Sequence, residues 1–295
     1  MNEPVANKSA KKDKLAKWLV GGFGVLFIGW ILFRLPIARE GGVSLLGRAG
    51  PCAVPLILKA MQDENVGVQT TALAALIRIG PSTVPRLIAA LEHTDARRRN
   101  DAAFALYYFH LNGGRSSTGT ETKRTVAALV KSLHDTDSLV RWNSVRALWS
   151  IGPEAEVALT DLLGMFHDPN EKVRKETCAA LCRIGPHDPQ IVAGLVGALQ
   201  DSDFQVRIEV CHALSEIRTN SAMVVTALIV AMKDSHPEVR AEAIEALRDL
   251  GPAATLAIPP ITEALNDPDA HVRDEAAEAL EQLRSLPVNE SIPRD

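Results

Sequence analysis

Residues 134–153, HDTDSLVRWNSVRALWSIGP, have apolar residues spaced as on one side of a helix and end in Gly-Pro. Val140, Ala147 and Leu148 lie on one apolar stripe. At about 100° per residue, Trp142 and Trp149 fall on the opposite side of the helix, where polar side chains are expected. The stretch predicts an amphipathic helix with two tryptophans on its solvent side.

The dipeptide Val-Arg of this stretch recurs along the chain. From Val140 it returns every 33 residues, at Val173, Val206, Val239 and Val272, and the register continues upstream at Val68 and Arg98. We call these seven residues the anchors of the repeats. The residue seven positions after each anchor is always alanine, and the next residue is always leucine. A small residue beside leucine at helical spacing allows close helix packing. The chain is therefore one unit repeated.

Each unit is expected to be a helix, a turn and a second helix. Gly-Pro pairs begin at Gly80, Gly152, Gly185 and Gly251, which we expect to end the first helix. An aspartate stands five residues before most anchors, and we interpret it as the helix N-cap and as the ionic partner of arginines in adjoining repeats. These columns are Asp63, Asp135, Asp168, Asp201, Asp234 and Asp267, and Arg99, Arg141, Arg174, Arg207, Arg240 and Arg273.

The columns resemble the HEAT-repeat family, in particular the short units called phycobilisome-lyase HEAT-like repeats. The resemblance implies an all-α fold, an α-solenoid of about seven helix-turn-helix repeats. It implies activity only loosely, because such families contain scaffolds, bilin lyases and a di-iron hydroxylase. The hydroxylase type resembles an array with several His-Glu pairs, and this sequence has none.

An uncharged segment precedes the repeats. Residues 18–33, WLVGGFGVLFIGWILF, lie between Lys17 and Arg34 and as a helix would span about 24 Å. We interpret residues 18–34 as a transmembrane anchor; a cleaved signal peptide and a buried soluble helix are the alternatives. Five lysines before the segment favour a cytoplasmic amino terminus and place the repeats outside the cytoplasm.

The expected organisation follows from these segments. Residues 1–17 form a basic cytoplasmic tail, residues 18–34 the anchor, and residues 37–285 the repeat solenoid. Residues 112–124 form an insertion within the solenoid, and we expect residues 286–295 to be a disordered tail.

Charge excludes nucleic acid as the expected partner. The chain carries a net charge of −4, and residues 234–295 alone hold 14 acidic residues against five arginines. Such a segment repels phosphate. We find no phosphate loop and no Ser-His-Asp or catalytic cysteine motif, so no catalytic residue or cofactor is assigned, and no small-molecule substrate is evident.

Two patterns resemble metal sites. The Asp-x-Asp sequences at Asp135, Asp201 and Asp267 lack the remaining ligands of a calcium loop, and we interpret them as helix caps. Cys178, Cys182 and Cys211 fall on neighbouring helices, but no CxxC pair is present. Buried free thiols are the leading interpretation, a disulfide or zinc the alternatives, and no metal ligand is assigned.

The solvent-side column supplies the candidate binding site. Tyr107, Trp142 and Trp149 lie on it, and arginines lie nearby in the sequence. Either the insertion folds over this patch to make a local core, or the patch docks a partner. The expected partner-binding residues are Tyr107, Trp142, Trp149, Arg97, Arg98 and Arg146.

The sequence thus predicts a membrane-anchored, non-catalytic scaffold that binds a protein or peptide. The alternative is an enzyme or enzyme subunit on the same scaffold, either of the bilin-lyase type or metal-dependent.

Overall fold

The computed structural model describes residues 39–113, 119–186, 188–217 and 222–285. These residues form helices and connecting turns, and no strand occurs among them. The chain divides into two compact units, residues 1–154 and residues 155–295, and each is described by itself. Residues 18–34, expected to be the anchor, and the tail at 286–295 lie outside the described residues.

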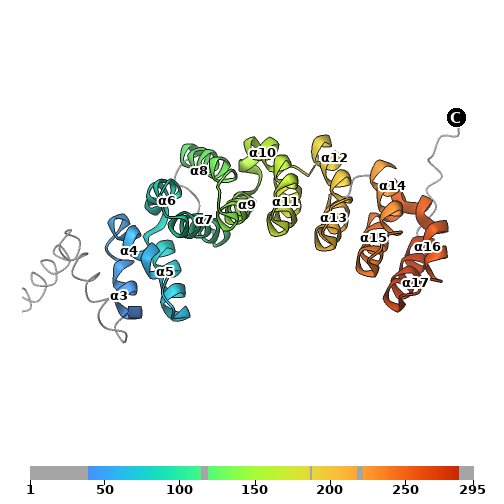
Figure 1. The fold of residues 1–295 in the computed structure, drawn as a ribbon, viewed down its shortest axis with the longest axis horizontal. Helices are drawn as coiled ribbons and strands as arrows, with labels where there is room; N and C mark the ends of the chain where they lie inside the picture. Colours follow the sequence, from blue (N-terminus) through green and yellow to red (C-terminus); the bar gives the residue numbers. More distant parts are fainter. Residues whose placement is uncertain (1–38, 114–118, 187, 218–221, 286–295) are drawn as a thin grey trace, which may run out of the picture. The chain divides into compact units, whose positions relative to one another are not determined.

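Unit 1 is a double layer of helices (Figure 1). One layer is formed by the first helix of each repeat, and the other layer by the second helix of each repeat. The first helices are α3 (Arg39–Leu46), α5 (Val66–Ile79), α7 (Ala96–Leu111) and α9 (Ser138–Ile151). The second helices are α4 (Val54–Ala60), α6 (Val84–Leu91) and α8 (Gly119–Ser132).

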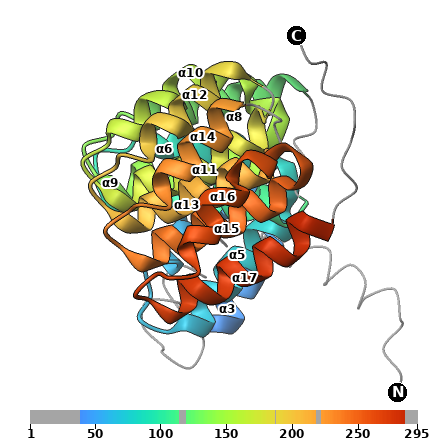
Figure 2. The same cartoon turned by 90° about the vertical axis from the view of Figure 1, so that its right-hand side faces the viewer.

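Unit 2 repeats the arrangement, and Figure 2 views it from the α17 end. Its first helices are α11 (Glu171–Ile184), α13 (Phe204–Glu216), α15 (Pro237–Leu250) and α17 (Ala270–Ser285). Its second helices are α10 (Leu159–Gly164), α12 (Pro189–Ala198), α14 (Ala222–Ala231) and α16 (Ile258–Ala264). Each unit is therefore built as an α-solenoid, with helical hairpins stacked side by side.

The core of both units is made by the predicted alanine and leucine columns. Every member of both columns is buried. They are Ala75, Ala105, Ala147, Ala180, Ala213, Ala246 and Ala279, and Leu76, Leu106, Leu148, Leu181, Leu214, Leu247 and Leu280. Burying a leucine side chain contributes about 1.5–3 kcal/mol. The repeated pair therefore contributes to the core of every repeat.

The Gly-Pro pairs end the first helices as predicted at all four positions, and three of the glycines have positive φ. Gly80, Gly152 and Gly251 have φ angles of 80°, 77° and 59°, which a residue with a side chain rarely adopts. The backbone then continues as 3₁₀ helix, at Gly80–Thr83, Gly152–Ala158 and Gly251–Ala257. Gly185 differs, with φ −144°.

The N-cap prediction is wrong by two residues. The cap is the residue three positions before the anchor, as in Asp137 and Asp203, whose carboxylates accept from the first backbone N–H groups of α9 and α13. In four repeats the aspartate five positions before the anchor instead accepts hydrogen bonds from the arginine of the preceding repeat. The Asp-x-Asp spacing serves both purposes, because each aspartate has a separate partner.

The arginine ladder between repeats is confirmed. In each of four pairs, Nε and Nη2 of the arginine donate to the two carboxylate oxygens over 2.6–2.8 Å. The pairs are Arg99–Asp135, Arg174–Asp201, Arg207–Asp234 and Arg240–Asp267. Burial works against the charge on Asp201, but hydrogen bonds from Arg174 and from the N–H of Asp203 leave the pKa of Asp201 below its usual value.

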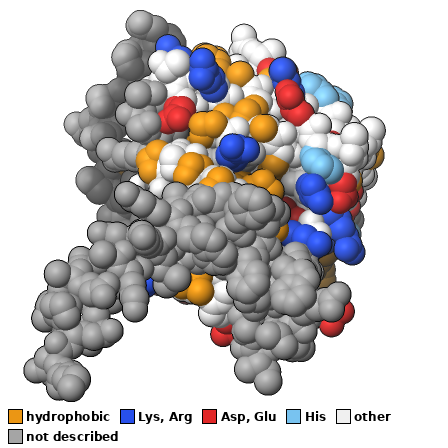
Figure 3. Space-filling view, turned by 90° about the vertical axis from the view of Figure 1, so that its left-hand side faces the viewer, with side chains coloured by type: hydrophobic (Ala, Val, Ile, Leu, Met, Phe, Trp, Pro, Cys, Tyr) orange, Lys and Arg blue, Asp and Glu red, His pale blue; other side chains and the backbone are white. Residues whose placement is uncertain are grey.

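The two units differ in the character of their exposed side chains. Hydrophobic side chains gather together with Lys and Arg side chains on the face of the molecule that Figure 3 shows. At the end of unit 2, Asp274, Glu278 and Glu281 of α17 are exposed. A polar outer face is typical of a repeat that closes a solenoid.

One described stretch, Val66–Leu91, is long and apolar enough to span a membrane by length and composition alone. It comprises α5, a 3₁₀ turn and α6, and Leu76 and Leu87 of this stretch lie in the core of unit 1. Its apolar character is explained by packing within the repeats.

Candidate protein-interaction surface

Arg146 of α9 contacts one of the two tryptophans of this helix and also contacts α7. Arg146 lies one turn after Trp142, and its guanidinium carbon is 4.6 Å from the centre of the Trp142 ring. The same carbon is 4.0 Å from the centre of the Tyr107 ring on α7. Cation–π contacts of this kind contribute about 0.5–2 kcal/mol each. Arg146 is therefore the centre of the aromatic group, and not part of its rim.

Hydrogen bonds beneath the rings join the same two helices. Asn143 is almost fully buried, and its Nδ2 donates to Oδ1 of Asn100 on α7 over 2.8 Å. Arg146 donates from Nη1 to Oδ1 of Asn143 over 3.4 Å. A buried amide needs such partners. The network holds Arg146 in place, so the surface above it is preorganised.

The aromatic surface continues along α7. Phe104 lies 6.1 Å from Tyr107 and 6.4 Å from Tyr108 between ring centres. Phe104, Tyr107, Tyr108 and both tryptophans are half-buried, so each ring shows an edge or a face to solvent. We call Phe104, Tyr107, Trp142, Arg146 and Trp149 the aromatic face.

The structure places Arg97 and Arg98 at the start of α7, away from Tyr107. They precede Tyr107 by ten and nine residues on the same helix, which is about 14–15 Å along its axis. Both are exposed, and Nη1 of Arg98 lies 3.1 Å from Nε2 of His93. Proximity in sequence suggested them, but the helix carries them to its other end.

The insertion at residues 112–124 is partly helical. Residues 119–124 form the first turns of α8, and residues 114–118 are outside the described part of the chain. The described residues do not test whether the insertion covers the aromatic face, so the local core and the docking surface both stay as alternatives.

One buried polar atom near this surface has no hydrogen-bond partner. Within the described residues it is Nε2 of His110, at the end of α7. The ring meets Phe109 edge-on at 5.4 Å. Burial lowers the pKa of His110 to about 4, although the nearby Glu154 carboxylate acts in the opposite direction. The imidazole is therefore neutral at pH 7.

The cysteines of unit 2 are free thiols. Cys178, Cys182 and Cys211 are buried, and burial raises the pKa of Cys182 to about 12 and that of Cys178 well above its usual value. Thiols of this kind are unreactive at neutral pH. No group of three or more His, Cys, Asp or Glu side chains that could hold a metal ion occurs in the described parts of the chain.

A second distinctive surface lies on the first helices of unit 2. Glutamates stand three residues after successive anchors, at Glu176, Glu209, Glu242 and Glu275. Glu245, Asp249 and Glu278 add further acids on α15 and α17. We call Glu209, Glu216, Glu242, Glu245, Asp249, Glu275 and Glu278 the acidic face. The repeated glutamate column could have indicated this surface from the sequence. The net charge of the segment counts these acids but does not show that they recur at one position of the repeat.

Comparison with known proteins identifies the repeat. The family model for HEAT repeats matches residues 36–107, 159–225 and 224–293, which together make up more than half of the chain. The chain belongs to the HEAT-repeat family. Among curated proteins no match is found.

Solved structures show the same fold as these HEAT repeats. An engineered protein is 27% identical over 68% of this chain and 96% of its own, with TM-score 0.50. A second engineered protein is 23% identical over 92% of this chain and 81% of its own, with TM-score 0.52. YibA of Escherichia coli is 19% identical over 97% of this chain and 100% of its own, with TM-score 0.58. These likenesses concern architecture and carry no activity.

Proposed function

We propose that the chain is a membrane-anchored, non-catalytic HEAT-repeat scaffold that binds a protein or peptide partner on the aromatic face. The HEAT-repeat architecture supports a role in protein interaction in general. The observation that carries the finer proposal is the Arg146 guanidinium stacked on Tyr107 and Trp142. Aromatic and arginine side chains held rigidly at a half-exposed surface are typical of binding hot spots.

The mechanism is recognition without a covalent step. Tyr107 and Arg146 come from different repeats, so a partner that spans them contacts two repeats at once. The network through Asn143 fixes these side chains before binding, which lowers the entropy lost on association.

The anchor is a separate part of the proposal. It rests on residues 18–34 and their flanking charges, which favour a cytoplasmic amino terminus with the repeats outside the cytoplasm. Alkaline carbonate extraction of membranes should leave the full chain in the pellet. Recovery in the soluble fraction would remove the anchor from the proposal and leave the scaffold role unaffected.

The binding role is tested by proximity labelling from the carboxyl terminus of the full chain, which reports its compartment and its neighbours. Trp142→Ala and Arg146→Ala should lose neighbours that the wild type labels. Phe204→Ala is the matched control, because it truncates a half-buried aromatic that stacks on His236 in unit 2, at 4.4 Å. Equal labelling by all variants, with unchanged circular dichroism, would contradict the proposal.

The rival function is an enzyme or enzyme subunit of the bilin-lyase or metal-dependent type. Elemental analysis and an absorption spectrum of the purified full chain separate the two. Stoichiometric iron, zinc or pigment would replace the scaffold proposal with the enzymatic one.

A further inference from the structure

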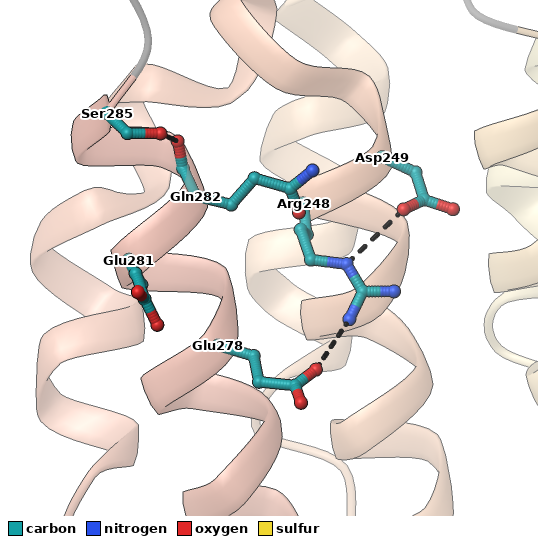
Figure 4. A pocket seen from close by; sticks show the side chains of 6 residues that line it. All are labelled: Arg248, Asp249, Glu278, Glu281, Gln282 and Ser285. Carbon is teal, nitrogen blue, oxygen red and sulfur yellow. Dashed lines mark hydrogen bonds and ion pairs between the residues drawn. The ribbon is translucent and has the colours of Figure 1, made fainter.

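Arg248 of α15 shows how the acidic face holds a guanidinium group. Its side chain extends toward α17 beside a hollow of about 660 Å³ (Figure 4). Nη1 lies 3.2 Å from Glu275 and 3.3 Å from Glu278, both on α17. Nη2 lies 2.9 Å from Glu245, and Nε lies 3.4 Å from Asp249. One arginine thus meets four carboxylates.

The preceding repeat has most of the same surroundings but lacks the arginine. Moving back by 33 residues replaces Arg248 with Ser215, Asp249 with Glu216, Glu275 with Glu242 and Glu278 with Glu245. Glu245, which already bonds Arg248, lies between the two positions. Ser215 is too short to reach these acids, and its hydroxyl donates to the backbone oxygen of His212 over 2.8 Å.

Of the carboxylates around Ser215, Glu245 bonds Arg248, whereas Glu216 and Glu242 face a histidine. His212, which replaces Glu245 in the 33-residue shift, lies 3.5 Å from Glu216 and 3.8 Å from Glu242. Burial, followed by repulsion from Glu245, raises the pKa of Glu242. By contrast, Glu209 of the same column has Lys175 at 3.7 Å. Glu242 is therefore a half-buried acid that a cation from outside would stabilise.

We propose that Glu216, Glu242 and Glu245 form a receptor for an arginine side chain of a protein partner. The neighbouring repeat supplies the template, since equivalent carboxylates hold Arg248. The planar guanidinium donates in several directions to separated acids, which a lysine ammonium does less well. Glu216 and His212 are more than half exposed, so an incoming side chain reaches the group from solvent.

This inference deepens the proposed scaffold role, but it uses a different surface. It concerns α13 and α15 of unit 2, whereas the aromatic face lies on α7 and α9 of unit 1. Trp142→Ala should therefore leave arginine binding unchanged, and the two proposals fail separately.

The test measures fluorescence anisotropy of a labelled peptide, Gly-Arg-Gly-Arg-Gly, with the full chain. The lysine analogue should bind several-fold more weakly. Ser215→Arg should weaken binding at least tenfold, because the new side chain occupies the receptor as Arg248 occupies its own. Glu242→Gln should weaken binding several-fold, and it also tests the receptor if Ser215→Arg does not fold.

Glu263→Gln is the matched control, since it removes one exposed negative charge from α16, outside the acidic face. It should bind like the wild type. Equal affinity of Ser215→Arg and the wild type, equal binding of the lysine and arginine peptides, or equal weakening by Glu263→Gln and Glu242→Gln would each overturn the receptor.

Discussion

The first helices of the two units share one frame and carry different surfaces. Nine residues after the anchor, unit 1 has Ile77, Tyr107 and Trp149, whereas unit 2 has Cys182, Ser215, Arg248 and Glu281. Both units keep the same alanine and leucine columns and the same arginine ladder. The alanine and leucine columns are thus fixed by packing, whereas the column nine residues after the anchor differs from repeat to repeat, and its members Cys182 and Ser215 are buried. The outward columns are where function is expected in a HEAT-repeat chain.

The largest expected effect concerns the arginine–aspartate pairs, and it tests whether they stabilise both units to the same extent. Asp135→Ala in unit 1 and Asp201→Ala in unit 2 each leave an arginine without its carboxylate. The paired side chains are only 8–15% exposed. Removing one partner of such a pair costs about 3–5 kcal/mol. Urea unfolding should show similar losses for both variants, and a loss near zero in either unit would break the comparison.

Unit 1 should have an acid sensitivity of its own between pH 6.5 and pH 4, caused by His110. His110 occupies the position at which Gly152 and Gly251 end their helices, and its pKa is lowered to about 4 by burial. Between pH 6.5 and 4 the unfolded chain binds a proton that the folded chain does not, so stability is complete above pH 6.5 and falls as the pH falls. The loss approaches about 3 kcal/mol near pH 4.

The comparison with His110→Leu isolates this contribution from the titration of the carboxylates. The difference in unfolding free energy between wild type and variant should change steadily from pH 7 to pH 4.5. A constant difference over that range would show that His110 is not the acid-sensitive group.

The two surface arginines should respond differently to salt. Arg146→Ala removes contacts with two rings, and we expect a loss of about 1–2 kcal/mol that persists in 1 M NaCl. Arg248→Ala leaves four carboxylates facing one another, and we expect a loss of about 1 kcal/mol that shrinks as salt screens the repulsion. Thermal unfolding at two salt concentrations distinguishes them. The same salt response for both variants would contradict the assignment of the two faces.

The smallest effect concerns the helix caps. Asp137→Ala and Asp203→Ala each remove bonds to two backbone N–H groups at the start of a first helix. Each should cost about 1 kcal/mol. A loss as large as that of Asp135→Ala would mean that the cap and ladder roles of the two aspartates had been assigned the wrong way round.

The sequence predicts the frame well because the frame is periodic. The 33-residue spacing, the core columns and the pairing of arginine with aspartate between repeats all follow from it. The N-cap was misplaced because Asp135 and Asp137 are both good caps, and only the structure shows that Arg99 takes the first of them. The spacing also could not show that the guanidinium of Arg146 reaches the rings of Tyr107 and Trp142.

The acidic face illustrates the same limit. Ser215 and Arg248 occupy the same position in successive repeats. The net charge of the segment, however, does not show which acidic side chains have a cation close to them. The relation becomes visible when distances show Arg248 bonded to acids whose equivalents surround Ser215.

The central claim is that partners bind to the outward side of the first helices. Site-specific photo-crosslinking in cells that express the full chain tests it directly, with benzoylphenylalanine in place of Phe104 on the aromatic face or of Leu256 in the 3₁₀ segment Gly251–Ala257 of unit 2. Leu256 is 73% exposed and serves as an accessible control. The account predicts a discrete crosslinked protein from position 104 and none from position 256. Crosslinking from position 256 alone, or to the same protein with equal yield from both positions, would contradict it.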